Sequence, residues 1–289
     1  MPLVRWQFRG LPESERKAFL FTNVVDALGR KYDMPVAVGC LAASREVYAL
    51  GLNCSVDEIA SKWMHAENNP IEPRLVESAP VQEVVHIGDE LMSHGGLGEF
   101  PLPISTPGFD NGPYTTSSHW FTRDPETKIL NIGNYRGQVK SPLRMGIALS
   151  SRNHGGMHWG KCREKGIPLQ AALVVGAPPA VAYTAPARVP YGKSELGVAG
   201  GLAGAPIDVV RCKSVDLEVP AWAEIVVEGE ISTEALEPEA PFGEATGYVA
   251  TRLMHPFFNV KCITHRNNPV LMNIVSQFPP SESSIMRQM

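Results

Sequence analysis

Residues 223–231, AEIVVEGEI, decide the fold class, because they contain the β-branched run IVV (225–227), followed by Ile231, between turn signals. Such a run is typical of a strand. Similar segments occur at 119–124 (HWFTRD), 129–137 (ILNIGNYRG), 146–151 (GIALSS), 169–176 (LQAALVVG), 208–219 (DVVRCKSVDLEV), 245–251 (ATGYVAT), 257–266 (FFNVKCITHR) and 270–277 (VLMNIVSQ). Among them, residues 155–166 (GGMHWGKCREKG) are the one clear helix candidate. Many short strands with turn-rich links predict a closed or sandwiched β unit.

The first part of the chain has a different pattern. Residues 13–32 have helical charge and apolar spacing up to about Gly29, and 44–52 and 55–69 predict two further short helices. Residues 81–88 are strand-like, and the Gly- and Pro-rich residues 95–113 predict a connector. We therefore expect an α+β protein, with an N-terminal α/β region over residues 1–106 and a second domain over residues 107–289.

The end of the sequence suggests that the polypeptide continues. The last residues, PPSESSIMRQM, resemble a capped helix that has only begun, with Ser281 or Ser283 as its cap. The N-terminal helical region is also thin for a separate domain. We expect this chain to be part of a longer polypeptide.

Composition limits the partners. The net charge is −4 with a pI of about 6.1, so no basic field is available to hold nucleic acid or an anionic membrane. No apolar run approaches the roughly 20 residues of a membrane helix, and the N-terminus has no secretory signal. Five dispersed cysteines without a CxxC pair favour reduced thiols. We expect a cytoplasmic protein without nucleic-acid or membrane partners.

Four segments carry polar residues that apolar strands do not need. They are NIGNYR (131–136), SRNHGGMHWGK (151–161), GKSELGVAGG (192–201) and PEAPFGEATGY (238–248). Asn, His and Glu together can bind a divalent ion, and this donor set suits Mn²⁺ or Mg²⁺ better than Zn²⁺. An ion with few protein ligands keeps positions open for a phosphate, so an acidic protein can capture an anionic cofactor.

Two acids near the end of the chain can share one arginine. Glu239 and Glu244 are five residues apart, and Pro241 and Gly243 between them permit a bend that would bring both carboxylates together. The guanidinium of Arg136 could then bridge them. Such an arrangement suits one of the acids to proton transfer.

Each segment also has an ordinary structural interpretation. Asn131 and Arg136 could be a turn residue and a surface charge, and His154 could be a helix cap. PEAPFGE could be a hairpin, and GVAGGLAG (197–204) a close helix–strand contact without the Lys-Ser/Thr of a phosphate loop. Spacing alone leaves these alternatives open.

The order and separation of the four segments resemble the UbiD family of prenylated-flavin decarboxylases. NIGNYR resembles the family's Asn-x4-Arg segment, and His154 follows Asn131 by 23 residues, as in the family. Residues 194–231 resemble its long central stretch, and PEAPFGEATGY is close to its Glu-Gly-Pro-Phe-Gly-Glu-x-x-Gly-Tyr. The resemblance covers roughly residues 107–283.

This resemblance implies a fold, a metal site and a cofactor. The implied fold for residues 107–289 is a split β-barrel like that of flavin reductases. The implied ligands of Mn²⁺ (or Mg²⁺) are Asn131, His154 and Glu195. The implied K⁺ ligands are Ile132, Thr184, Ala185, Ala187 and Glu195. The residues implied to contact prenylated FMN are Asn131, Gly133, Asn134, Tyr135, Arg136, Asn153, His154, Ala185, Pro186, Ala187, Arg188 and Glu195.

The resemblance also implies a reaction. Arg136, Glu239 and Glu244 match the family's catalytic network, in which Glu244 would donate a proton to the carbon that loses CO₂. The implied activity is the reversible, non-oxidative decarboxylation of an aromatic, heteroaromatic or α,β-unsaturated acid, with the electrons accepted by the modified flavin. The implied partners are the small carboxylic acid, CO₂, a flavin prenyltransferase that supplies the cofactor, and further copies of the chain or a partner subunit.

The sequence departs from the family in three places. Ala240 replaces a glycine, Asn153 stands where some members have Gln, and family members continue beyond Ser283 into a C-terminal domain that we expect this chain to lack. Two alternatives therefore stay open. One is a split-barrel flavin reductase or oxidoreductase, which needs FMN but not the Glu-Arg-Glu network. The other is an inactive flavin-binding subunit or fragment.

Overall fold

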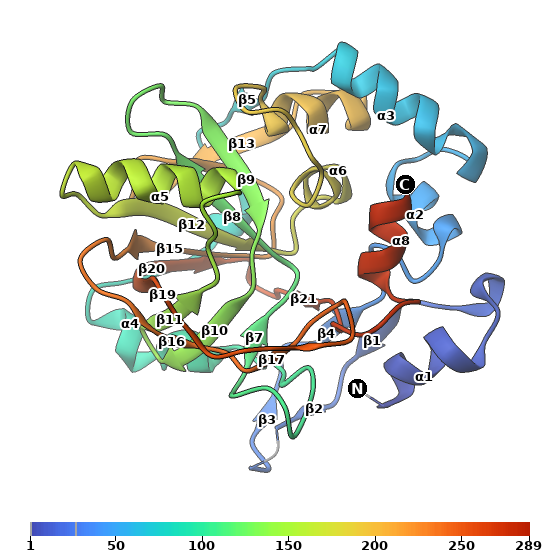
Figure 1. The fold of residues 1–289 in the computed structure, drawn as a ribbon, viewed down its shortest axis with the longest axis horizontal. Coiled ribbons are helices and arrows are strands. Elements are labelled where there is room, and N and C mark those ends of the chain that lie inside the picture. The colour runs from blue at the N-terminus through green and yellow to red at the C-terminus, as the bar shows by residue number, and fades with distance from the viewer. Residues whose placement is uncertain (1, 27) are drawn as a thin grey trace.

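The computed structural model describes residues 2–26 and 28–289, and its centre is a curled antiparallel sheet of nine strands (Figure 1). Eight strands follow the order β7-β10-β11-β20-β15-β12-β8-β9, and β6 pairs with the second half of β20. Their bounds are β6 Val84–Ile87, β7 Tyr114–Thr115, β8 Ser118–Arg123, β9 Leu130–Asn134, β10 Gly137–Ser141, β11 Arg144–Ile147, β12 Leu169–Val175, β15 Ile225–Ile231 and β20 Phe257–His265. The predicted α+β class with a split β-barrel is confirmed.

Apolar packing between neighbouring strands forms the core of this sheet. Leu173 on β12 lies opposite Val227 on β15 and opposite Trp120 on β8. The Trp120 ring packs edge-on against Phe258 on β20, with ring centroids 5.1 Å apart, and neither residue is exposed. Burial of each such side chain contributes about 1.5–3 kcal/mol, so the strands hold the walls of any site rigidly in place.

One helix, α5, packs along strands β8, β9 and β12, and most of the other helices lie to one side of the sheet (Figure 1). The α-helices are α1 Pro2–Gly10, α2 Arg45–Gly51, α3 Ile59–Asn68, α4 Glu90–Ser93, α5 His154–Glu164, α6 Pro179–Thr184, α7 Glu195–Ala203 and α8 Glu282–Gln288. The short 3₁₀ helices are η1 Glu13–Glu15, η2 Val56–Glu58, η3 Pro80–Gln82 and η4 Gly96–Glu99. Across the described residues, no helix combines the length and apolarity needed to cross a membrane.

Smaller sheets join segments that are far apart in the sequence. The three-stranded sheets are β1 (Phe19–Phe21), β4 (Val36–Val38) and β21 (Leu271–Asn273), and β14 (Glu218–Pro220), β13 (Asp208–Arg211) and β5 (Arg74–Leu75). The two-stranded pairs are β2 (Val24–Val25) with β3 (Lys31–Tyr32), β16 (Glu237–Glu239) with β19 (Leu253–His255), and β17 (Phe242–Gly243) with β18 (Val249–Ala250). Strands from both sides of residue 106 thus pair with each other, and the division of the chain between residues 106 and 107 stays a prediction.

The helix predicted over residues 13–32 is wrong. Residues 19–21 form β1, which pairs with β4, and residues 24–25 and 31–32 pair as β2 and β3. The partner strand supplies backbone hydrogen bonds that outweigh the helical spacing of the apolar residues, because strand preference depends on the neighbours more than on the segment itself. The helices predicted at 44–52 and 55–69 are confirmed as α2 and α3, whereas α1 was missed.

The second half of the chain has more helix than its sequence predicts. The predicted helices α5 and α8 are confirmed, α8 with Ser281 as its cap, but the second half also contains α6 and α7, and GVAGGLAG forms most of α7. Glycine has a low helix propensity, which hid α7 in the sequence. The helix forms because its glycines allow a close approach to residues 66–71. The strand predicted at 245–251 shrinks to Val249–Ala250, and the one at 146–151 shifts to Arg144–Ile147.

Candidate active site

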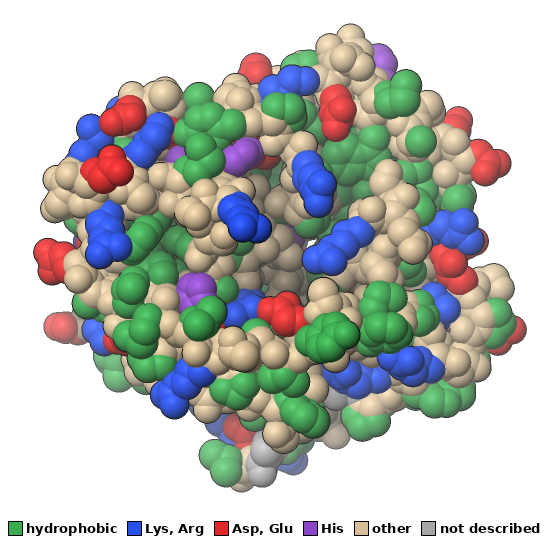
Figure 2. Space-filling model, in the orientation of Figure 1, with side chains coloured by type: hydrophobic (Ala, Val, Ile, Leu, Met, Phe, Trp, Pro, Cys, Tyr) green, Lys and Arg blue, Asp and Glu red, His purple; other side chains and the backbone are tan. Residues whose placement is uncertain are grey.

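The candidate active site is a cavity of about 540 Å³. Figure 2 shows a hollow near the middle of one face, with Lys and Arg side chains around it. The cavity wall is formed by residues 131–136, by the starts of α5 and α7, by residues 185–189, by residues 242–245 and by α8. This volume lies within the range of small-molecule sites.

Nearly all of the predicted site residues line this cavity. Every residue predicted to contact the cofactor does so, as do Ile132 and Glu244. The two exceptions are Glu239 and Thr184, which are fully buried and do not line it. Five segments that are separated in the sequence therefore contribute to one wall, namely residues 131–136, 153–154, 185–188, 195 and 244.

His154 and Glu195 face each other because two helices begin at the same place. His154 is the first residue of α5 and Glu195 the first of α7, and their caps, Asn153 and Ser194, each accept a hydrogen bond from a backbone N–H in the first turn. Cap bonds of this kind fix where a helix starts. As a result, Nδ1 of His154 lies 3.6 Å from Oε1 of Glu195.

The protonation of this pair suits a divalent cation. Burial raises the pKa of Glu195 to about 7, and hydrogen bonds from the backbone N–H groups of Glu195 and Ile132 offset only part of that effect. Burial also lowers the pKa of His154, so its ring is neutral at pH 7. A buried carboxylate that faces a neutral imidazole lacks a positive partner, which a metal ion would supply.

Asn131 supplies the third candidate ligand from β9. It is 3% exposed and lines the same cavity, and its amide nitrogen donates to Oγ1 of Thr122 at 3.4 Å. The amide oxygen, the imidazole nitrogen and the carboxylate oxygen of the three residues are donors that suit Mn²⁺ or Mg²⁺. The residues present therefore fit a divalent ion.

The predicted K⁺ ligands are less clearly gathered. Ala185 and Ala187 line the cavity, but Thr184 is buried at the end of α6. Its hydroxyl donates to the carbonyl of Val181, and its own carbonyl accepts from the Ala187 N–H at 3.1 Å. The K⁺ site stays a prediction.

Arg136 joins the two acids as the sequence predicts. Its Nε lies 2.8 Å from Oε1 of Glu239, its Nη2 lies 2.6 Å from Oε2, and its Nη1 pairs with the carboxylate of Glu244. The Glu239 side chain is 1% exposed and that of Glu244 is 35% exposed. Glu239 therefore fixes the guanidinium from behind, while Glu244 is the acid that can meet a molecule in the cavity.

The bend between the two acids is held by the segment predicted as a connector. The N–H of Asn111 donates to the carbonyl of Pro241, and the N–H of Gly243 donates to Oδ1 of Asp110 at 2.8 Å. Ala240, where the family that the sequence resembles has glycine, adopts a φ of 76°, a left-handed conformation that favours glycine. The predicted bend is present, with an alanine in its most demanding position.

Several residues of the cavity were missed in the sequence. Phe242 packs against Arg136, whose Cζ lies 5.3 Å from the ring centroid. Three further arginines gather at the cavity, of which only Arg188 was predicted, the others being Arg152 and Arg287. Their charges suit the phosphate of a nucleotide cofactor. Arg287 lies on α8, and the capping signal of that helix gave no hint of where it docks.

Comparison with known proteins supports a single family. Residues 74–279 match the family model described as UbiD, 3-octaprenyl-4-hydroxybenzoate carboxy-lyase Rift-related domain. The chain is 37% identical over 207 residues to the uncharacterized protein sll0936 of Synechocystis sp., covering 72% of this chain and 40% of that protein. It is 36% identical over 213 residues to an uncharacterized protein of Archaeoglobus fulgidus, covering 73% and 42%. The chain thus spans about two fifths of the length of these curated relatives.

Solved structures with the same fold include a UbiD-class enzyme and a decarboxylase. An evolved dimeric form of the UbiD-class enzyme HmfF of Pelotomaculum thermopropionicum, in complex with prFMN, superposes with a TM-score of 0.80 at 36% identity, over 87% of this chain and 57% of that one. The vanillic acid decarboxylase of Sedimentibacter hydroxybenzoicus superposes with a TM-score of 0.83 at 28% identity, over 93% and 57%. Because the family model spans most of its length and these structures share its fold, the chain belongs to the UbiD family.

Proposed function

We propose that this chain carries the cofactor-binding and catalytic part of a decarboxylase that removes CO₂, reversibly and without net oxidation, from an aromatic, heteroaromatic or α,β-unsaturated acid. The main support is that the acid pair held by Arg136 adjoins the cavity that the three candidate metal ligands line. The small acid and CO₂ would then bind in this cavity. Further copies of the chain or a partner subunit would complete the assembly.

The cofactor in this proposal is prenylated FMN, which a flavin prenyltransferase would supply. Asn131, His154 and Glu195 would hold Mn²⁺ or Mg²⁺ next to its phosphate, and Arg152, Arg188 and Arg287 add positive charge around the cavity. The proposal also includes a K⁺ ion, with the ligands Ile132, Thr184, Ala185, Ala187 and Glu195. The bound cofactor supplies an acceptor for the electron pair released with CO₂. HmfF, with its prFMN, supports this choice at 36% identity.

The chain's own residues would handle the proton and the charge. Arg136 would attract the substrate carboxylate into the cavity, while Glu239 keeps the guanidinium in one orientation. When the bond between the substrate carbon and its carboxyl group breaks, CO₂ leaves and that carbon takes a proton from Glu244. In the reverse direction Glu244 takes the proton back. The partial exposure of Glu244 lets it reach the substrate and exchange protons with water.

The test is CO₂ release from a panel of ¹³C-carboxyl acids by chain co-expressed with a flavin prenyltransferase. Glu244→Gln should lower the rate by about 10²–10⁴-fold without changing the flavin retained. Glu234→Gln, at an exposed acid away from the cavity, is the matched control and should leave the rate unchanged. Equal rates in Glu244→Gln and the wild type would contradict the proposal. Reduction of FMN by NADH without CO₂ release would favour the flavin-reductase alternative instead.

A further inference from the structure

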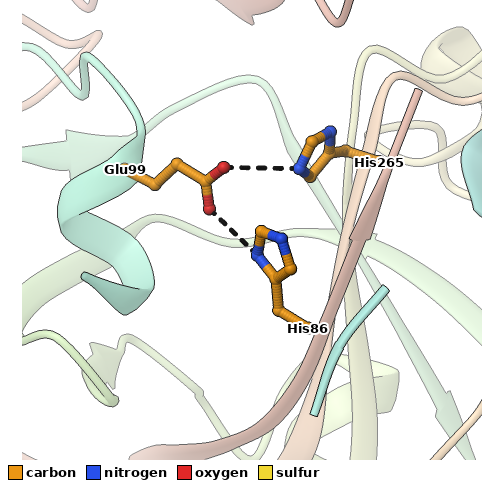
Figure 3. Close-up of side chains that lie close together, drawn as sticks. All are labelled: His86, Glu99 and His265. Carbon is orange, nitrogen blue, oxygen red and sulfur yellow. Dashed lines mark ion pairs between the residues drawn. The ribbon is translucent and has the colours of Figure 1, made fainter. Parts of the chain in front are cut away.

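A second group of possible metal ligands lies outside the cavity. His86 on β6, Glu99 at the end of η4 and His265 at the end of β20 point toward one another (Figure 3). None of the three lines the candidate active site. The proposed decarboxylase function gives them no role.

The strand register explains why the two histidines meet. His86 lies opposite Ile263 in the antiparallel pair of β6 and β20. Side chains two residues apart on a strand point to the same face, so His265 is the diagonal neighbour of His86. Their ring centroids are 5.4 Å apart.

A tight turn before η4 positions the carboxylate of Glu99. Gly95 and Gly96 adopt φ values of 85° and 55°, and the N–H of Leu97 donates to the carbonyl of Pro142 at 2.8 Å. A Cβ at Gly96 would lie only 2.3 Å from that carbonyl oxygen, so this position requires glycine. The turn is therefore built to press η4, and with it Glu99, against the sheet.

The three ligand atoms are close enough for one ion. Nδ1 of His86 lies 3.2 Å from Oε2 of Glu99, and Nε2 of His265 lies 3.4 Å from Oε1. One ligand atom from each residue can be chosen so that all lie within 4.8 Å of one another. Ligand atoms of a tetrahedral zinc site are about 3.4 Å apart, given bonds of about 2.0–2.2 Å. A small inward movement would complete such a site.

The contacts between these atoms do not have hydrogen-bond geometry. Within the described part of the chain, Nδ1 of His86, Nε2 of His265 and Oε2 of Glu99 are buried and make no hydrogen bond of good geometry. The side chains of the two histidines are 6% and 8% exposed. A buried polar atom without a partner costs about 1–3 kcal/mol, so three together point to a missing ligand.

The tautomer of His265 favours metal binding. Its Nδ1 lies 2.7 Å from the carbonyl oxygen of Arg266, a contact in which Nδ1 must carry the hydrogen. In the neutral ring the lone pair then lies on Nε2, the atom that faces Glu99. A backbone carbonyl behind the ring is the usual outer partner of a metal-bound histidine.

A proton is the competing explanation. Burial lowers the pKa of His265, but its contacts with Glu99 and the Arg266 carbonyl outweigh burial and raise the pKa overall. A charged His265 paired with Glu99 would account for two of the three residues. It would leave the 3.2 Å contact between Nδ1 of His86 and Oε2 of Glu99 without hydrogen-bond geometry.

We infer that His86, Glu99 and His265 form a binding site for one divalent transition-metal ion, with Zn²⁺ as the expected ion. The bound ion would link residues 84–99 to β20. Two imidazoles and one carboxylate are a frequent zinc donor set, unlike the oxygen-rich set at Asn131. The fourth position is open to water.

After dialysis against ZnSO₄, elemental mass spectrometry measures the zinc bound per chain. Thermal unfolding measures how much the bound zinc stabilises the protein. Glu195→Gln removes the other candidate metal site, and that protein should still retain one zinc ion per chain. Adding Glu99→Gln should weaken zinc binding by at least about 100-fold. Even the loss of a residue that only hydrogen-bonds a metal ligand lowers metal affinity by about 10–100-fold. Adding Glu90→Gln, at an exposed acid on α4, is the control and should change nothing.

Equal zinc content and equal thermal stabilisation in the proteins with and without Glu99→Gln would overturn the inference. If Glu99→Gln prevents folding, Co²⁺ titration of the Glu195→Gln protein decides instead. The visible bands of four- or five-coordinate cobalt at one equivalent would support the site. Their absence would overturn it.

Discussion

Arg136 and Glu239 form a two-pronged ion pair, with Nε to Oε1 at 2.8 Å and Nη2 to Oε2 at 2.6 Å. Their side chains are 16% and 1% exposed. A buried pair of this kind holds its members in one geometry, and removal of one member leaves the other charged and unpaired. The pair therefore ties the stability of the fold to the shape of the site.

Replacement of Arg136 tests this relationship. Arg136→Met should lower the free energy of unfolding by about 3–5 kcal/mol, because Glu239 would be buried without a partner. The double variant Arg136→Met, Glu239→Leu should recover most of the loss. The check is urea unfolding, with Arg74→Met as control, since the exposed pair of Arg74 and Asp208 should contribute less than about 1 kcal/mol. Equal effects of Arg136→Met and Arg74→Met would show that the buried pair does not stabilise the fold.

Glu282, at the start of α8, should make stability depend on pH. Burial raises its pKa from 4.5 to about 7, although backbone N–H groups that include that of Ala42 partly offset the effect. Between these two values the folded protein holds a proton that the unfolded chain has released. Stability from this group is therefore complete below about pH 4.5 and is lost as the pH rises through 7, by about 3 kcal/mol in all.

Glu282→Gln cannot ionise and isolates this contribution. Urea unfolding at several pH values should show a fall in stability between pH 4.5 and 8 that is smaller in the variant than in the wild type, by about 3 kcal/mol. Glu234→Gln, at an exposed position, should keep the wild-type slope. Identical slopes in wild type and Glu282→Gln would show that the carboxyl group is not buried as described.

Gly200 on α7 allows the close packing that places Glu195. A Cβ at Gly200 would lie 2.2 Å from the carbonyl oxygen of Ile71, so Gly200→Ala should destabilise the protein by about 1–3 kcal/mol despite the higher helix propensity of alanine. Gly160 on α5 has nothing within 4 Å of such a Cβ, and Gly160→Ala should stabilise by up to about 1 kcal/mol. Thermal unfolding distinguishes the two, and a stabilised Gly200→Ala would refute the close contact.

The local sequence pattern predicted those strands and bends that depend mainly on neighbouring residues. The apolar runs that include Ile225–Ile231 and Phe257–His265 are strands, because β-branched residues between turn signals prefer extended backbone. The convergence of Glu239 and Glu244 on Arg136 was also predicted, since the residues between the two acids permit a bend.

The features that the sequence did not predict depend on contacts between residues that are far apart in the chain. Residues 19–21 are a strand because β4 pairs with them, and β4 in turn pairs with residues 271–273 near the other end of the chain. Arg287 reaches the cavity because Glu282, at the start of α8, accepts a hydrogen bond from the N–H of Ala42 and so docks this helix. His86, Glu99 and His265 carry no motif spacing, because a strand register and a glycine turn bring them together.

The most direct test of the central claim is the mass of the flavin that the chain retains after co-expression with a flavin prenyltransferase. The wild type should retain a flavin heavier than FMN by the prenyl group, together with a divalent ion, and the double variant His154→Gln, Glu195→Gln should lose it. Unmodified FMN beside an intact metal site, no flavin at all, or equal retention by the double variant would contradict it.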